Sequence, residues 1–182
     1  MRAALLLTGP VLLAACGGPP AGSPYFPLEA GHAWTYEVRS EWDNTTTARE
    51  TRVLRTLGPE ALDGGAAWRR RSDSGVDYWL RADARGVYRV ASKTDLDRDP
   101  RPDAAPRFVL KAPLAVGTNW QAATAPYLLM RRAAFPPGLR HTHPSVPMTY
   151  TIEAVGVPLD TRAGRFDDCV RVSSGTPTAS IV

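Results

Sequence analysis

The feature of this chain that most restricts its fold is an alternation of apolar and polar residues in short runs. In residues 34–39, WTYEVR, every second side chain is apolar, and residues 148–154, MTYTIEA, show the same pattern. Such alternation is typical of a strand that buries one face. Shorter candidate strands cover residues 50–57, 67–72, 76–82, 86–92, 107–111 and 168–173.

Turn-forming residues separate these runs at LDGG (62–65), DSG (73–75) and ARG (84–86). Glycine accepts positive φ at little cost, so these positions favour tight connections between neighbouring strands. The pattern predicts a mainly β fold, an antiparallel meandering sheet or open half-barrel with at most one or two short helices. We expect one short helix at YLLMRRAAF (127–135), and a surface loop at KTDLDRDPRPDAAP (93–106), because proline cannot donate to a strand ladder.

One pattern occurs twice, as PLEAGHAW at 27–34 and PLAVGTNW at 113–120. Proline fixes φ and excludes helix before it, glycine permits a tight turn, and tryptophan begins the next extended run. We interpret the pattern as a unit that starts a strand and buries its tryptophan. In the alternative interpretation, Trp34 and Trp120 contact a ligand.

The first residues predict export. Residues 1–15 combine Arg2 with an apolar run that ends in small residues, which is the layout of a signal peptide. The run is interrupted by Gly9-Pro10 and is too short to cross a bilayer as a helix. With 182 residues the chain fits one core, so we predict a signal peptide at 1–15, a lipidated cysteine and flexible spacer at 16–24, and a single β-rich domain at 25–182.

The sequence LAAC at 13–16 resembles the lipobox of bacterial lipoproteins, in which the cysteine is lipidated and becomes the N-terminus. The resemblance implies that Cys16 carries fatty chains such as palmitate, and that the chain lies in the cell envelope. Because Gly17, not Asp, follows the cysteine, it implies the inner leaflet of the outer membrane, facing the periplasm. The alternative is an ordinary signal peptide with an incidental cysteine. Two or more acyl chains anchor a protein stably.

Three groups of residues in the mature chain carry a further resemblance: YFPL at 25–28 with Gly31, Trp34 and Tyr36; PL at 113–114 with Gly117 and Trp120; and Ala163-Gly164 with Phe166 and Cys169. They resemble a family of uncharacterised bacterial lipoproteins whose domains open with YFPL-x-x-G-x-x-W-x-Y and carry a later AG-x-F-x-x-C-x-x-V segment. The resemblance implies location and a β-rich fold, without an activity. Such domains usually continue through further strands, so the ending SSGTPTASIV favours a C-terminally truncated product with an unpaired sheet edge.

Residues that could carry chemistry are few, and the common hydrolase, phosphate-loop and dinucleotide motifs are absent from the sequence. His141 and His143 could share a metal, but a zinc site needs further ligands and the only other histidine is His32. The acidic residues of 95–99, DLDRD, imitate a calcium loop, but prolines occupy its required glycine and glutamate positions. We therefore expect no metal, no cofactor and no catalytic residue.

Two further features have ordinary explanations. If Cys16 is lipidated, Cys169 has no intramolecular partner, and we expect a small residue buried in a strand in preference to a reactive thiol. The net charge is +4, and the run Arg69-Arg70-Arg71 indicates a solvated strand face or a contact with anionic lipid head groups. Nucleic acid is not expected as a partner in the envelope.

Three hypotheses for the function follow. The first is a membrane-anchored, periplasm-facing binding or envelope-maintenance module with no enzymatic activity. The second is a carrier of lipid or another hydrophobic ligand, because open barrels enclose apolar cavities and the chain holds five Trp and six Tyr. The third, and the least supported, is a metal-dependent enzyme that uses His141 and His143.

Overall fold

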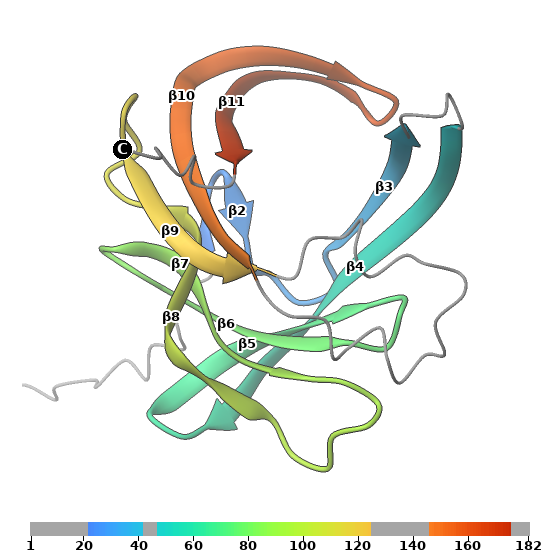
Figure 1. Cartoon of the computed structure of the whole chain (residues 1–182), viewed down its shortest axis with the longest axis vertical. Helices are drawn as coiled ribbons and strands as arrows, with labels where there is room; N and C mark the ends of the chain where they lie inside the picture. The colour runs from blue at the N-terminus through green and yellow to red at the C-terminus, as the bar shows by residue number, and fades with distance from the viewer. Residues whose placement is uncertain (1–21, 42–46, 125–145, 176–182) are drawn as a thin grey trace, which may run out of the picture.

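The computed structural model describes residues 22–41, 47–124 and 146–175, and within these ranges every regular element is a strand (Figure 1). The strands are β1 (Gly22–Ser23), β2 (Phe26–Pro27), β3 (Ala33–Glu41), β4 (Thr47–Leu62), β5 (Gly65–Ser72), β6 (Asp77–Asp83), β7 (Gly86–Lys93), β8 (Arg101–Lys111), β9 (Asn119–Thr124), β10 (Val146–Thr161) and β11 (Gly164–Gly175). The predicted helix at 127–135 lies outside the described residues.

The strands form a half-barrel, which confirms the fold predicted from the sequence. Strands β3 to β8 make a six-stranded antiparallel sheet in chain order, and β9, β10 and β11 make a three-stranded sheet. In Figure 1 the β10–β11 hairpin arches back towards β3, and Arg162 at its turn contacts the carboxylate of Glu37. On the same side, the Tyr25 hydroxyl donates to the Asp168 carboxylate at 3.0 Å. The connection between β1 and β2, which carries Tyr25, therefore lies against β11.

Each predicted strand is present, and the structure extends most of them. The predicted turns are also confirmed, because Leu62 pairs with Gly65 and Asp83 pairs with Gly86, leaving two-residue loops. In β4 the prediction ended at residue 57, whereas the strand continues to Leu62. A register shift between Thr56 and Gly58 places Leu57 in a bulge. The strand continues beyond this bulge, where the sequence pattern predicted its end.

The surface loop predicted at 93–106 is wrong for Lys93, which ends β7, and for its last six residues. Strand β8 begins at Arg101 and includes both Pro102 and Pro106. Two features of β8 explain why a strand can contain these prolines. β8 is the edge strand of its sheet, and its register shifts between the pairs Arg89–Arg107 and Ala91–Pro102, so Pro106 falls within an irregularity. Proline is tolerated at edges and bulges because no ladder donor is needed there.

The repeated pattern forms the same backbone structure in both places. Gly31 and Gly117 have φ values of 85° and 88°. The Gly31 amide donates to the carbonyl of Thr56, and the Gly117 amide donates to that of Ile152, both at 2.9 Å. The return bonds run from Thr56 to the His32 carbonyl and from Ile152 to the Thr118 carbonyl. Each unit therefore docks a turn onto a long neighbouring strand and starts its own strand, as predicted. The predicted burial of the tryptophan is confirmed for Trp120, whereas Trp34 is only half-buried.

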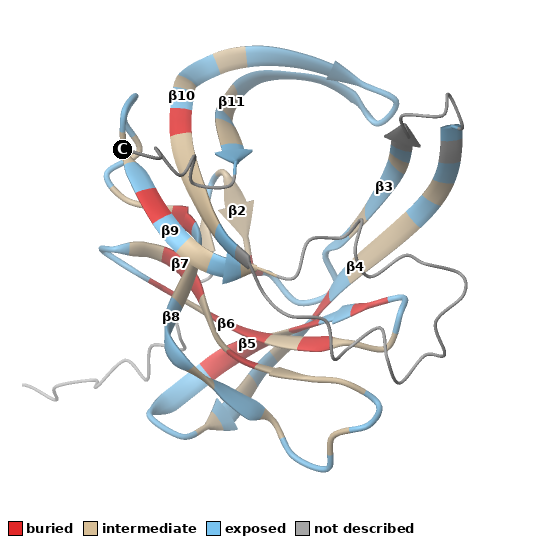
Figure 2. Ribbon diagram, in the orientation of Figure 1, coloured by how far each residue is buried: buried red, intermediate tan, exposed pale blue. Residues whose placement is uncertain are grey.

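The sheet of β3 to β8 has two differently packed faces. The inner face, which β2 and β11 cover in part, carries a buried cluster of Leu28, Trp68, Leu80, Ala82, Val87 and Leu110. The outer face carries a smaller cluster of Ala67, Trp79 and Ala91. Figure 2 shows that buried residues concentrate along β5, β6 and β7. The centre of the sheet is thus the packed core, and its remaining inner surface is free to form a site.

Candidate ligand cavity

A cavity of about 860 Å³ lies on the inner face of the half-barrel. Strands β3 to β9 and β2 all contribute to its wall. The apolar and aromatic lining includes Phe26, Tyr36, Leu54, Val76, Tyr78, Leu80 and Val109, and the charged lining consists of Arg70, Arg89, Asp103 and Arg107. Three guanidinium groups and one carboxylate give the described lining a formal charge of +2.

Arg70 is the most deeply buried charge of the cavity, with 5% of its surface exposed. Its guanidinium carbon lies 4.1 Å from the ring centre of Trp34 and 5.0 Å from that of Phe26. Its Nε is buried without a hydrogen-bond partner. Burial lowers the pKa of Arg70, and hydrogen bonding to Tyr36 opposes that change. Among the described residues no carboxylate forms an ion pair with it, so the faces of Trp34 and Phe26 and the phenol of Tyr36 stabilise it instead.

Arg107 enters the cavity from the edge strand β8. Its Nη2 donates to the Thr124 hydroxyl at 2.7 Å, and that hydroxyl lies 2.9 Å from the Tyr150 hydroxyl. Burial lowers the pKa of Arg107, and the nearby charge of Arg89 lowers it further. No salt bridge joins Arg107 to a carboxylate within the described part of the chain. It is therefore a second incompletely neutralised cation in the same cavity.

Arg89 differs from these two arginines because it has a bidentate partner. Its Nε and Nη2 donate to Asp103 at 2.7 and 2.5 Å, and both side chains are 17% exposed. Tyr78 lines the same wall, and the guanidinium carbon of Arg89 lies 5.8 Å from the centre of its ring. Burial raises the pKa of the Tyr78 phenol, while the positive charges of Arg89, Arg107, Arg52 and Arg70 oppose that change.

The two tryptophans predicted as ligand contacts lie outside the cavity lining. Trp34 stacks on His32 with ring centres 5.3 Å apart and reaches the cavity only through the guanidinium of Arg70. Trp120 is 4% exposed, stacks on Tyr150, and donates its indole N–H to the Phe108 carbonyl at 3.1 Å. Its contacts join β9 to β8. A direct ligand contact by Trp34 or Trp120 stays a prediction.

The remaining residues singled out in the sequence are dispersed. Cys16, His141 and His143 lie outside the described residues. His32 occupies an exposed turn, with its Nδ1 3.4 Å from the Glu29 carboxylate. Cys169 is a free thiol on β11, as expected, but it is half-buried and not fully buried.

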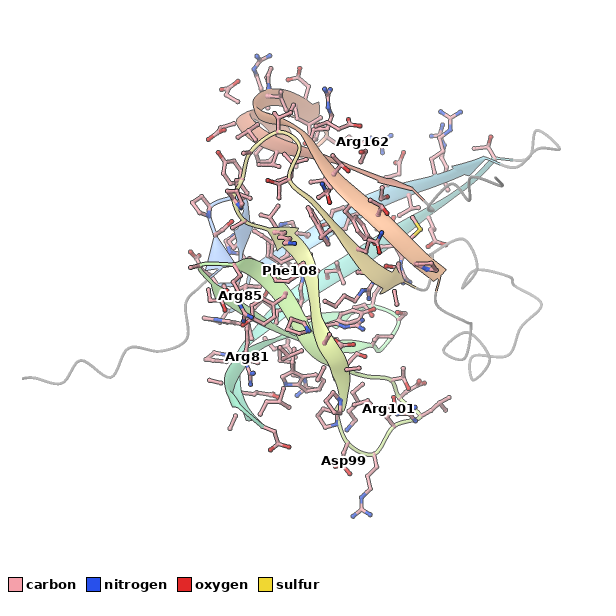
Figure 3. The ribbon with its side chains drawn as sticks, turned by 60° about the vertical axis from the view of Figure 1, so that its left-hand side comes forward. Arg81, Arg85, Asp99, Arg101, Phe108 and Arg162 are labelled. Carbon is pink, nitrogen blue, oxygen red and sulfur yellow. The ribbon has the colours of Figure 1, made fainter. Side chains whose placement is uncertain are left out.

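In the candidate calcium loop, the carboxylate of Asp97 contacts neighbouring protein groups. Asp97 accepts hydrogen bonds from the Thr94 amide and hydroxyl at 2.9 and 2.8 Å and also contacts Arg101. Figure 3 shows Asp99 at the tip of this connection between β7 and β8. No group of three His, Cys, Asp or Glu side chains in the described ranges is placed to hold a metal ion.

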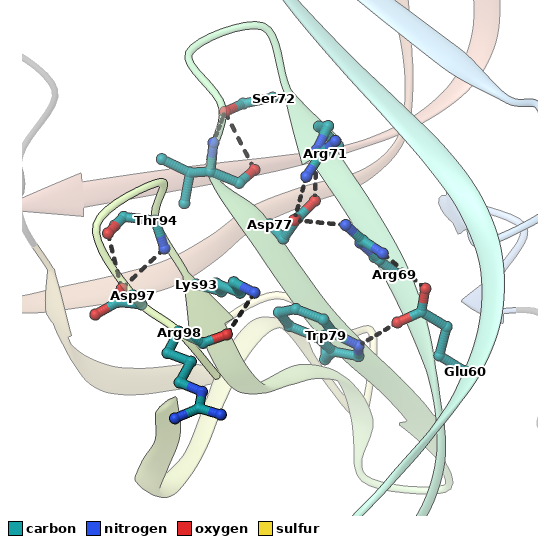
Figure 4. A network of polar contacts seen from close by, with 11 residues as sticks. Glu60, Arg69, Arg71, Ser72, Asp77, Trp79, Lys93, Thr94, Asp97 and Arg98 are labelled. Atoms are coloured by element: carbon teal, nitrogen blue, oxygen red, sulfur yellow. Dashed lines mark hydrogen bonds and ion pairs between the residues drawn. The ribbon is translucent and has the colours of Figure 1, made fainter. Parts of the chain in front are cut away.

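A polar network on the outer face holds β4, β5 and β6 together (Figure 4). Asp77, 1% exposed, accepts from Arg69 at 2.8 Å and from Arg71 at 2.8 and 2.7 Å. Glu60 joins the network by accepting from Arg69 at 2.8 Å and from the Trp79 indole at 3.1 Å. Burial opposes ionisation of Asp77, but the two arginines outweigh it and lower its pKa. The carboxylates of this network have internal partners, whereas the buried Nε of Arg69 has none, and the network lies away from the cavity.

The arginine run was misread in the sequence. The solvated strand face predicted for residues 69–71 is wrong for Arg70, because successive side chains of β5 point to opposite faces. Arg69 and Arg71 join the outer network, whereas Arg70 turns into the cavity beside the core. The sequence signal that could have identified Arg70 as inward-facing is its position two residues after Trp68 in the predicted strand, which puts both side chains on the same face.

Comparison of the chain with models of protein families, with curated proteins and with solved structures gave no match. Within the described ranges, no helix is both long and apolar enough to cross a membrane.

Proposed function

We propose that this chain is a lipid-anchored, periplasm-facing binding protein, and that the cavity of the half-barrel holds a hydrophobic or amphipathic small molecule. The observation that carries the proposal is the cavity of about 860 Å³. Small-molecule sites usually measure roughly 300–1,000 Å³ and combine an apolar lining with a few polar groups. Both properties are met here. We propose binding or carriage of this ligand, without catalysis, as the role of the domain.

Two side chains on the cavity wall support this proposal. Tyr36 and Val109 are large, apolar and 43% and 39% exposed, although they belong to the face that carries the core. Burying such surface against a ligand contributes roughly 25 cal/mol per Å². A ligand that covers both side chains therefore gains affinity without any rearrangement of the core.

The ligand is testable by extracting what co-purifies with the full-length protein. The protein would be isolated gently from envelopes, extracted with organic solvent, and the extract analysed by mass spectrometry. In Ala105→Phe a ring fills part of the cavity wall, and Ala163→Phe, in the exposed β10–β11 turn, serves as the matched control. We expect a molecule that is enriched with the wild type and Ala163→Phe and depleted with Ala105→Phe. Equal extracts from all three proteins would contradict the proposal.

Anchoring through Cys16 at the outer membrane is a separate part of the proposal and has its own test. We expect radiolabelled palmitate to enter the wild-type chain and not Cys16→Ser. The variant should also leave the outer-membrane fraction, because it lacks the acyl chains that hold the protein there. If Cys16→Ser remains in that fraction to the same extent, the lipid anchor is refuted while the ligand proposal stands.

A further inference from the structure

The charges of the cavity identify the class of ligand. We propose that it is an anionic amphiphile, whose carboxylate or phosphate is held by Arg70 and Arg107 and whose apolar part lies against Tyr36, Leu54 and Val109. The inference rests on the proposed function, because it concerns the same cavity. It goes beyond that function by assigning the polar end of the ligand to two specific residues.

The first step of the argument is the burial of Arg70. A buried cation is costly unless it is paired and hydrogen-bonded. The faces of Trp34 and Phe26 stabilise the plane of its guanidinium, and Tyr36 hydrogen-bonds to its edge. The Nε of Arg70 has no partner although it is buried. A cation held by two ring faces and one phenol, with its Nε unpaired and no carboxylate beside it among the described residues, has donor capacity left for an anionic acceptor.

The second step is the position of Arg107. A guanidinium has five N–H donors in a planar fork, and one donor group of Arg107 is used by Thr124. This bond, together with the contact between Thr124 and Tyr150, fixes the side chain between β8 and the three-stranded sheet. Arg107 also hydrogen-bonds to Tyr150, and within the described residues no carboxylate pairs with the rest of its fork. Arg70 and Arg107 both line this cavity.

The third step is the contrast with Arg89. This arginine lines the same wall but is neutralised by two hydrogen bonds to Asp103. The carboxylate that could have neutralised the cavity is thus already used. The chain leaves two positive charges in a partly enclosed space where electrostatic interactions are stronger than in water. An anion that enters would satisfy both charges, and carboxylate and phosphate match the fork of a guanidinium.

The fourth step is the rest of the lining. An inorganic anion would fill only a small part of about 860 Å³ and would leave Tyr36 and Val109 exposed. A wholly apolar ligand would cover these side chains but would remove water from Arg70 and Arg107 without replacing it. A molecule with one acidic end and an apolar body satisfies both parts of the wall.

The experiment compares four probes that differ in charge and in apolar length: octyl phosphate, octanoate, octanol and inorganic phosphate. Binding to the full-length protein in phosphatidylcholine nanodiscs would be measured by calorimetry, with empty nanodiscs as the blank. Hydrogen bonds to charged groups contribute about 1.5–3 kcal/mol, which corresponds to roughly tenfold to hundredfold in affinity. We expect octyl phosphate and octanoate to bind at least tenfold more tightly than octanol and inorganic phosphate.

Variants locate the effect. We expect Arg70→Gln and Arg107→Gln each to weaken octyl phosphate binding about tenfold and to leave octanol binding unchanged. Arg165→Gln removes the same charge from an exposed position on β11 and serves as the control. The comparison of octanoate with octanol uses the wild type alone, so it decides the matter even if Arg70→Gln fails to fold.

The outcomes separate this inference from the proposed function. If octanol binds as tightly as octanoate, the anionic ligand is refuted and the apolar cavity remains. If inorganic phosphate binds as tightly as octyl phosphate, the amphiphile is refuted in favour of a simple anion site. If none of the four probes binds, both the inference and the ligand-binding function are overturned.

Discussion

The repeated turn offers the sharpest test of how the half-barrel is built. Gly31 and Gly117 both have positive φ, and an alanine Cβ at either position would meet no atom within 4 Å. The substitution Gly→Ala therefore introduces no collision, and its cost is confined to the left-handed backbone, about 1–2 kcal/mol per residue. We expect Gly31→Ala and Gly117→Ala each to lower the free energy of unfolding by this amount, measured by urea denaturation of the full-length protein.

Two comparisons make that expectation decisive. Gly175 also has free space around its Cβ position but does not have positive φ, so Gly175→Ala should be neutral or slightly stabilising. The double variant should lose about 2–4 kcal/mol, because distant sites without shared partners are additive. That is a large share of the 5–15 kcal/mol typical of a domain. If Gly31→Ala and Gly117→Ala are as neutral as Gly175→Ala, the turns do not direct the strands that follow them.

Two more predictions concern the contacts that hold the sheets. Asp77→Asn should cost about 2–3 kcal/mol in unfolding free energy, because Arg69 and Arg71 lose their shared carboxylate. The pKa of Asp77 is lower in the folded than in the unfolded protein, so its contribution to the free energy of unfolding is complete above the unfolded pKa near 4 and is lost as the pH falls towards the folded pKa. If the unfolding free energies of wild type and variant fell equally with pH, this reasoning would be contradicted. Trp120→Phe should cost about 1–3 kcal/mol, because the buried indole no longer donates to Phe108, and should accelerate hydrogen exchange in β9; unchanged exchange would show that the indole does not join the sheets.

The parts of the fold that local chemistry determines could be predicted from the sequence. Alternation located the strands, and paired turn residues located the hairpins at 62–65 and 84–86. The failure at Pro102 and Pro106 has a different origin. Whether a proline interrupts a ladder depends on whether its strand has a neighbour on that side, and no local pattern contains the strand order. β8 proved to be an edge strand, so its prolines displace no required hydrogen bond.

In the candidate site, too, some features follow from the local sequence and others depend on strands that are distant in the sequence. Successive side chains of a strand point to opposite faces, so Arg70 lies on the face of Trp68 and Arg69 lies on the other face. The residues of a charged run within a strand therefore have to be assigned to the two faces in turn before any of them is assigned to solvent. That Arg70 and Arg107 line one cavity could not be predicted, because β5 and β8 are brought to its wall by the intervening strands and by the curvature of the sheet. The same curvature leaves Asp103 beside Arg89, with no carboxylate paired to Arg107 among the described residues. The positive charge of the cavity is thus a property of strand order and pairing, and it is this unbalanced charge, more than the volume, that carries the proposal of an anionic ligand.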